Sequence, residues 1–149
     1  MRKVLAAIVA FLCFASTVLA ADTPLVLTTI HAGRQKVTIL RWKDSTGDGA
    51  VSTVQLPVWG KIYSVVTKPG SNPPESLLTI TFIDPNTGLD LMGGALATRS
   101  LVNTELAYPY RTGTTVVPYP VIAPAGVTAT FSTDAHANID GYVYVFWEE

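Results

Sequence analysis

The sequence has little cysteine, little charge and few long hydrophobic runs. Only 14% of its 149 residues are charged, and the 10 basic and 11 acidic side chains nearly cancel. The basic residues form no block or stripe, so a nucleic-acid partner is not expected. The single cysteine is Cys13, and the longest apolar run, Val4 to Leu12, lies directly before it. Both features therefore fall within the first 20 residues.

Residues 1–20 have the pattern of a signal peptide. A basic start at Arg2 and Lys3 precedes the apolar run, and the stretch ends at Val18-Leu19-Ala20, followed by Ala21. The run is shorter than the roughly 20 apolar residues of a comfortable membrane span. We therefore expect cleavage after Ala20. The alternative is an uncleaved hydrophobic anchor, and the membrane would then be contacted through this leader only.

Removal of the leader changes the chemistry that remains. The 149 residues minus these 20 leave 129, residues 21–149, enough for a single domain with its own core. Without Arg2 and Lys3, the chain has 8 basic and 11 acidic side chains, which gives a net charge of −3. Because Cys13 is lost as well, the mature chain has no thiol. This excludes disulfides, cysteine–zinc sites and a cysteine nucleophile.

The mature part is rich in residues that favour strands and turns. It contains 18 Thr and 14 Val together with all 11 Gly and all 10 Pro of the chain. The β-branched types suit a pleated surface, and Gly and Pro interrupt it at turns. Segments that alternate in polarity or are rich in β-branched residues predict strands at 25–31, 35–42, 50–56, 58–67, 76–83, 127–133 and 141–147. The fold class predicted is all-β, an antiparallel β-sandwich or open barrel of about seven to eight strands.

Two stretches leave alternatives open. Residues 50–67 contain either two strands or one long strand bent at Pro57 or Gly60. Residues 89–108 are the least strand-like part of the chain and contain either one or two helical turns or an ordered loop.

Prolines are concentrated in the stretch from Tyr108 to Pro124, which we call the arm. Proline lacks the N–H group that a strand ladder needs, so the arm is expected to be an edge strand or an extended segment. Tyrosine beside proline suits a protein contact or a sugar platform; alternatively, the rings close the ends of the core. The candidate interaction surface consists of Tyr108, Tyr110, Val117, Tyr119 and Ile122.

The last predicted strand is apolar on both faces, which carry Tyr142, Tyr144 and Phe146 on one side and Val143, Val145 and Trp147 on the other. A strand of an antiparallel sandwich commonly has one solvated face. The second apolar face must therefore meet a loop, the arm or another subunit. We expect a homo-oligomer.

A calcium loop is the first candidate chemical site. Asp44, Thr46, Asp48 and Gly49 stand at positions of such a loop, but its twelfth position is Gln55 instead of the bidentate glutamate. A turn in which Gly47 or Gly49 has a positive φ is the preferred interpretation.

The remaining candidates are weaker. The two histidines, His31 and His136, lack the spacing of a metal site, and Ser132, Asp134 and His136 lack the context of a nucleophile elbow. Asp84, Asp90 and Glu105 are interpreted as turn acids rather than an acid–base pair, and Gly93-Gly94 as a turn that needs small residues. We therefore expect no enzyme activity, no cofactor and no metal.

The middle of the chain resembles a group of small virion structural proteins of tailed phages. Residues 59–74 have the pattern of a strand followed by a proline loop. Residues 83–99 read IDPNTGLDLMGGALATR, similar to the family's aspartate-rich turn and its stretch D-L/V-L/M-G-G-x-L-A-x-R. Asn103-Thr104-Glu105 follows, and the resemblance covers roughly residues 35–147.

This resemblance implies a noncatalytic β-rich virion component, a capsid decoration or minor head or tail protein. Its partners would be other virion subunits or further copies of itself. The expected oligomer is a trimer, and the alternative is a monomer that orders on a capsid lattice. It implies no catalytic residues. The leader favours an alternative, a secreted or periplasmic β-sandwich that binds a carbohydrate or a cell-surface partner. The expected location is accordingly the virion, by the resemblance, or the periplasm or exterior, by the signal peptide.

Overall fold

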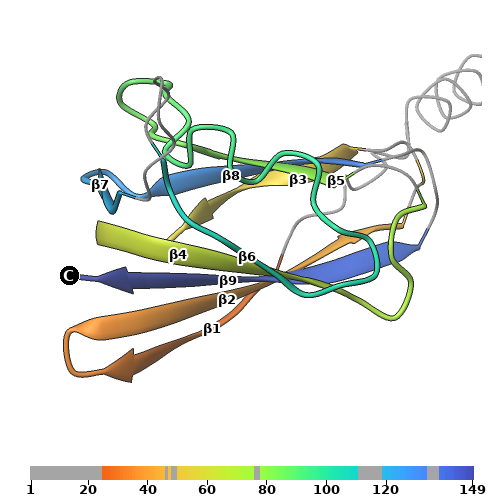
Figure 1. Cartoon of the computed structure of the whole chain (residues 1–149), viewed down its shortest axis with the longest axis horizontal. Coiled ribbons are helices and arrows are strands. Elements are labelled where there is room, and N and C mark those ends of the chain that lie inside the picture. Colours follow the sequence, from red (N-terminus) through yellow and green to blue (C-terminus); the bar gives the residue numbers. More distant parts are fainter. Residues whose placement is uncertain (1–24, 46, 48–49, 76–77, 111–118, 134–137) are drawn as a thin grey trace, which may run out of the picture.

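The computed structural model describes residues 25–45, 47, 50–75, 78–110, 119–133 and 138–149 (Figure 1). The predicted signal peptide at 1–20 lies outside them. The described residues form nine strands: β1 (Leu25–Ala32), β2 (Gln35–Asp44), β3 (Ala50–Leu56), β4 (Gly60–Pro69), β5 (Leu78–Ile83), β6 (Glu105–Ala107), β7 (Val121–Ala123), β8 (Val127–Thr133) and β9 (Ile139–Glu148). All their pairings are antiparallel, so the predicted fold class is confirmed. Within the described residues, no helix is long and apolar enough to cross a membrane.

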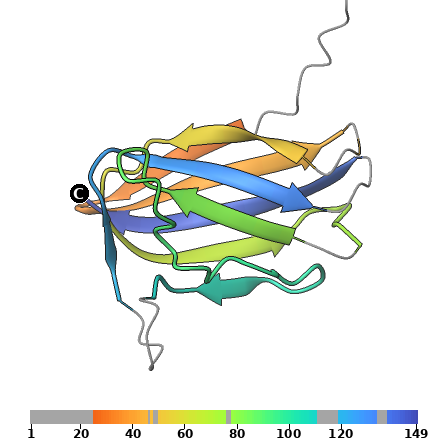
Figure 2. The ribbon, with the colours of Figure 1, turned by 90° about the horizontal axis from the view of Figure 1, so that it is seen from above.

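The strands form two sheets that lie one over the other (Figure 2). The larger sheet has the order β1-β2-β9-β4-β6, and β7 also pairs with β4. The smaller sheet has the order β3-β8-β5. This is the arrangement of a β-sandwich, in which the inner faces of both sheets supply the core.

Residues 50–67 contain two strands that lie in different sheets. Pro57 cannot donate to a ladder, and the N–H of Val58 bonds to the carbonyl of Leu56 at 2.8 Å. The chain therefore leaves the smaller sheet after β3 and enters the larger sheet at β4. At the crossing, Gly60 has φ 138°, and a Cβ there would lie 2.1 Å from the carbonyl oxygen of Glu148. Only glycine fits this position.

Two short strands raise the count above the seven to eight expected. β6 and β7 have three residues each, too few for alternation to be recognised in a sequence. Both are defined by their pairing with β4 rather than by their own pattern.

The stretch from 89 to 104 is an ordered loop, one of the two alternatives. Its backbone bonds to the edge of β5: the Leu91 N–H to the Phe82 carbonyl at 2.7 Å, and the Ile80 N–H to the Leu96 carbonyl at 3.0 Å. The local bonds of this stretch are turn bonds, in which the N–H groups of Gly93, Ala95 and Ala97 donate to the carbonyls three residues earlier. An α-helix needs bonds to the carbonyl four residues earlier, so the stretch is a series of turns.

The core lies between the sheets, and aromatic side chains link its two layers. The rings of Trp42 on β2 and Phe131 on β8 have centroids 5.9 Å apart. Gly141 makes room for the indole, because a Cβ there would lie 2.7 Å from Trp42 ring atoms. The buried Thr38 hydroxyl accepts a hydrogen bond from Trp147 Nε1 at 3.0 Å, so a polar group enters this core with a partner.

Candidate interaction surface

The described parts of the arm run along the edge of β4. β6, directly before the arm, pairs with residues 65–67 of β4, and β7, within the arm, pairs with residues 60–62. The Tyr119 N–H donates to the Pro109 carbonyl at 2.8 Å and joins the two described portions of the arm. β7 is therefore an edge strand, one of the two forms predicted for this proline-rich stretch.

Most of the predicted surface residues are exposed. Tyr108, Tyr119 and Ile122 are 47%, 68% and 66% exposed, and Tyr110 is partly buried. Val117 lies outside the described residues. The neighbours of Ile122 in β7 face inward, since Ala123 is fully buried and Val121 packs against the core. The alternation of β7 thus turns Ile122 outward.

Tyr119 and Ile122 line a cleft of about 620 Å³ beside the start of β4. Its other walls come from Pro120, Val121, Gly60, Lys61, Glu148 and Glu149. The cleft combines an aromatic ring and an aliphatic side chain with a cation and two carboxylates. It can contact either an apolar side chain or a polar ligand.

One hydrogen bond and one ion pair lie at this end of the sheet. The Tyr63 hydroxyl donates a hydrogen bond to the Glu148 carboxylate, and this bond, with burial and the negative charge, raises the pKa of Tyr63 above 10.0. Lys36 pairs with Glu149 and lowers the pKa of that carboxyl. Sequence reasoning missed Tyr63 and Glu148, because the contact joins residues 85 positions apart.

Tyr108 and Tyr110 line a second cleft, of about 360 Å³. The loop from 89 to 104 and β6 supply its other walls, which are Gly94, Ala95, Arg99, Leu106 and Ala107. A Cβ at Gly93 would lie 2.3 Å from the Tyr110 carbonyl oxygen, and one at Gly94 would lie 3.3 Å from the Tyr110 hydroxyl. Gly93-Gly94 is thus a small-residue turn, as predicted, and it lets the arm approach the loop closely.

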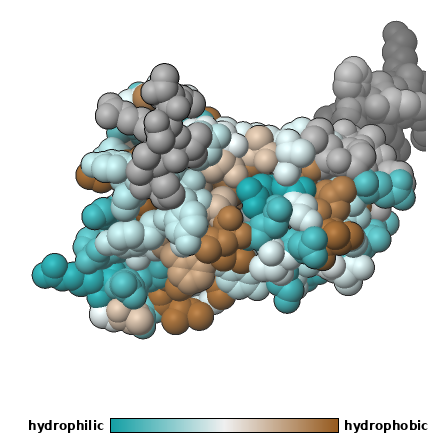
Figure 3. Space-filling view, in the orientation of Figure 1, coloured by the Kyte–Doolittle hydropathy of each residue, from teal (hydrophilic) through white to brown (hydrophobic). Residues whose placement is uncertain are grey.

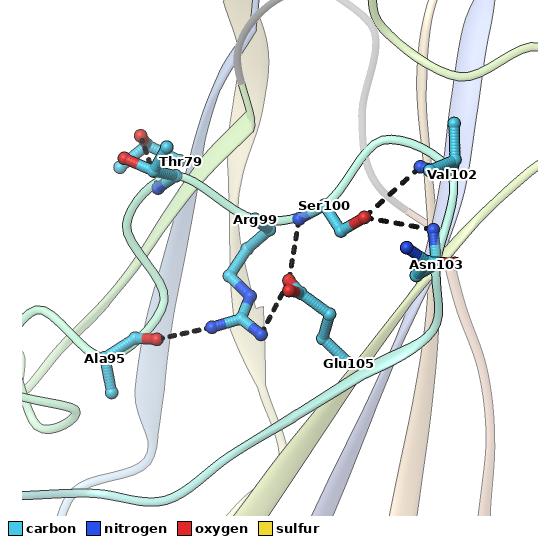
Figure 4. A network of polar contacts seen from close by, with 8 residues as sticks. Thr79, Ala95, Arg99, Ser100, Val102, Asn103 and Glu105 are labelled. Atoms are coloured by element: carbon cyan, nitrogen blue, oxygen red, sulfur yellow. Dashed lines mark hydrogen bonds and ion pairs between the residues drawn. The ribbon is translucent and has the colours of Figure 1, made fainter.

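An ion pair fixes the loop beneath this second cleft (Figure 4). Arg99 contacts the Glu105 carboxylate at 2.8 Å through Nη2 and donates to the Ala95 carbonyl at 2.8 Å through Nη1. The same carboxylate accepts the Ser100 N–H at 2.6 Å. Arg99 is largely buried, whereas Glu105 is about one-third exposed. Glu105 therefore acts as a local structural acceptor.

The outer face of the larger sheet is a further apolar surface, which sequence reasoning found only in part. Its middle consists of three aromatic side chains of β9. Apolar residues of the other strands lie beside them in the register of the sheet. These side chains are Tyr142, Tyr144 and Phe146 of β9, Val37 and Ile39 of β2, Val66 of β4, Leu106 of β6 and Ile30 of β1. Three of these are 37–54% exposed: Phe146, Leu106 and Ile30. In Figure 3 hydrophobic groups gather over the lower part of the molecule, where this sheet lies.

The two apolar sides of β9, the last strand, lie in different surroundings. The side chains of Val143, Val145 and Trp147 are buried in the core. The opposite side chains form the middle of the outer face, and the rings of Tyr142 and Tyr144 stack with centroids 6.4 Å apart. Arg41 and Lys68 flank Tyr142 in the neighbouring strands, so the apolar area ends there at a polar rim. The described arm residues pair along the sheet edge and leave this face uncovered.

The turn after β2 has a structural role. The fully buried Asp44 accepts the Gly47 N–H at 2.8 Å through Oδ1, and Gly47 has φ 76°, the positive value predicted for Gly47 or Gly49. Thr46, Asp48 and Gly49 lie outside the described residues. Among the residues described, no three His, Cys, Asp or Glu side chains gather as metal ligands.

The other candidate residues are dispersed. Asp84 accepts the Asn86 N–H at 3.0 Å and the Thr87 hydroxyl at 2.8 Å, and Asp90 accepts the Gly94 N–H at 2.6 Å. Both are turn acids, as interpreted from the sequence. His31 is exposed on β1, and Asp134 and His136 lie outside the described residues.

Comparisons with known proteins give no relative for this chain. A scan against family models, a search of curated proteins and a search of solved structures each find no match.

Proposed function

We propose that the protein is a noncatalytic structural component of a tailed-phage virion, a capsid decoration or a minor head or tail protein. It acts through protein–protein contacts, and the arm binds neighbouring virion subunits. The support comes from the exposed side chains of the arm, the apolar outer face of the larger sheet and the resemblance of residues 35–147.

One observation carries the proposal. Part of the stretch that carries the resemblance, residues 93–105, lies beside the arm. Gly93 and Gly94 approach Tyr110, and the Arg99–Glu105 pair holds the loop that lines the second cleft. In this chain these residues support tyrosines at a sheet edge. Tyrosine is enriched at protein interfaces, where its ring packs and its hydroxyl remains hydrated.

Mass spectrometry of purified phage particles tests the proposal. Peptides from residues 21–149 are expected in particles banded on a density gradient, at a copy number comparable to that of other virion proteins. A culture in which particle production is blocked serves as the control for co-purification. Their absence from particles, with the protein present in the medium or periplasm, would refute the virion role.

A secreted or periplasmic sugar-binding module is the second candidate. The observation that favours it is the Tyr119 ring, 68% exposed at the edge of a cleft that also holds Lys61 and Glu148. An exposed ring with polar groups nearby suits stacking and hydrogen bonding to a sugar. Glycan-array binding that is lost in Tyr119→Ala and kept in Val102→Ala would favour this candidate. No glycan binding, with peptides found in particles, would exclude it.

A further inference from the structure

The described residues form two sheets with four edges, and three of these edges carry features that prevent another strand from adding. The edge of β5 bonds to the loop from 89 to 104 through Leu78, Ile80 and Phe82. The edge formed by β6 and β7 consists of strands of three residues, with prolines on both sides of β7. β3 has a register shift between Val51 and Val54, and Pro57 follows its end. Coverage, short length, bulges and proline are the usual protections of an edge.

The fourth edge, β1, lacks most of these protections. Leu25–Ala32 contains no proline and no Lys, Arg, Asp or Glu. Its register shift is confined to the interval between Val26 and Thr28, and Thr28 to Ala32 pairs regularly with β2. Among the described residues β1 pairs only with β2, so its other side presents backbone donors and acceptors that can bond to a further strand.

The side chains of β1 extend the apolar outer face to this edge. Ile30 is 54% exposed and lies in register with Val37, which lies in register with Phe146. The row of apolar groups across the larger sheet thus ends at an exposed isoleucine. A strand added beside β1 would bury Ile30 if it carried an apolar group at the matching position.

We propose that β1 pairs with β1 of a second copy of this chain, antiparallel about a two-fold axis, with Ile30 opposite Ile30 of the second copy. The sequence of β1 is compatible with pairing to a second β1. Its β-branched residues favour the pleated conformation, and self-pairing brings no Lys, Arg, Asp or Glu side chains together. The two larger sheets become one continuous sheet, and the apolar row continues from copy to copy. Such a contact closes at two copies. It therefore gives a dimer in place of the trimer expected from the resemblance, and it does not depend on the virion role.

Sedimentation equilibrium of the purified full chain over a range of concentrations tests the proposal. The wild type is expected to be a dimer. Ile30→Lys places like charges directly opposite each other and should raise the dissociation constant at least tenfold. Val102→Lys, at a loop position 82% exposed, is the matched control and should leave it unchanged. A monomeric or trimeric wild type, or an Ile30→Lys variant that dimerises like the wild type, overturns the proposal.

A cross-link keeps the test decisive if Ile30→Lys does not fold. In a Cys13→Ser background, Ile30→Cys should form an intermolecular disulfide on mild oxidation. Opposite residues of antiparallel strands have Cα atoms about 4.5–5.5 Å apart, within disulfide range. Val102→Cys at the same concentration is the control and should stay uncross-linked. Equal cross-linking of the two variants, or none at position 30, overturns the proposal.

Discussion

At the scale of single residues, two glycines with similar backbone conformations have very different surroundings. Gly88 has φ 71° and nothing within 4 Å of the position of a Cβ. Gly93 has φ 61°, and a Cβ there would lie 2.3 Å from the Tyr110 carbonyl oxygen. Alanine at either site incurs the same left-handed strain, but only at Gly93 must the backbone of the arm move as well.

We expect Gly88→Ala to lower the free energy of unfolding by about 1 kcal/mol, the usual strain of a left-handed residue. Gly93→Ala should lower it by about 3 kcal/mol, because displacement of packed backbone adds to that strain. Urea unfolding followed by tryptophan fluorescence measures both values. Equal losses would mean that the arm is not held against the loop in solution.

The ionisation of Tyr63 provides a second test at this scale. Its hydrogen bond to Glu148 favours the neutral phenol, so Glu148→Gln should lower the pKa of Tyr63 toward 10.0. An ultraviolet titration of tyrosinate, with Tyr63→Phe to identify the signal, measures the shift. Since the folded pKa is raised, the stability from this pair is fully present below pH 10 and is lost as the pH rises through the folded pKa. An unchanged pKa in Glu148→Gln would contradict the contact.

At the scale of elements, β7 combines a buried and an exposed role. Ala123 is fully buried in the core, whereas Ile122 and the preceding Tyr119 are 66% and 68% exposed. The exposed pair can therefore be changed without removing core contacts. Substitutions at Tyr119 and Ile122 can therefore test binding by the arm independently of the folding of the domain.

The double variant Tyr119→Ser with Ile122→Ser should reduce binding to particles at least tenfold if the virion role holds. Its free energy of unfolding should change by less than about 1 kcal/mol, as is usual for exposed positions. Co-sedimentation with particles measures the first quantity and urea unfolding the second. Val102→Ser is the matched control. A double variant that unfolds would show that the arm belongs to the core.

At the scale of the whole molecule, the predicted leader sets the expected start of the mature chain. We expect the exported protein to begin at or near Ala21 and to contain no thiol, because Cys13 lies upstream of the cleavage site. Intact-mass measurement of the particle-bound or periplasmic protein, with a thiol assay, tests this. A mass that includes residues 1–20 would show that the leader is kept as an anchor.

Also at this scale, the apolar surfaces lie on different parts of the larger sheet. The arm follows the edge at β4, the outer face is centred on β9, and β1 forms the opposite edge (Figure 1). A contact at β1 and a contact at the arm can therefore be made together. The sandwich can pair with a second copy and still present the arm to another subunit.

The strand-forming segments could be predicted from the sequence alone, because alternation and β-branching are local properties of a chain. The segments predicted at 50–56 and 127–133 coincide with β3 and β8. The edge position of the arm was also predictable in kind, since proline confines a strand to an edge. The exposure of Tyr119 and Ile122 was one of two alternatives that the sequence left open.

The pairing of the strands, in contrast, depends on how the whole chain folds. β2 pairs with β9, about 100 residues away in sequence, and the chain changes sheets at Pro57. The Tyr63–Glu148 bond and the Arg99–Glu105 pair depend on such placements, as does the close approach of Tyr110 to Gly93. No local pattern encodes these contacts, because each is fixed by the packing of whole strands and loops against one another. For the same reason, the position of β1 at a sheet edge follows only from the placement of the other described strands.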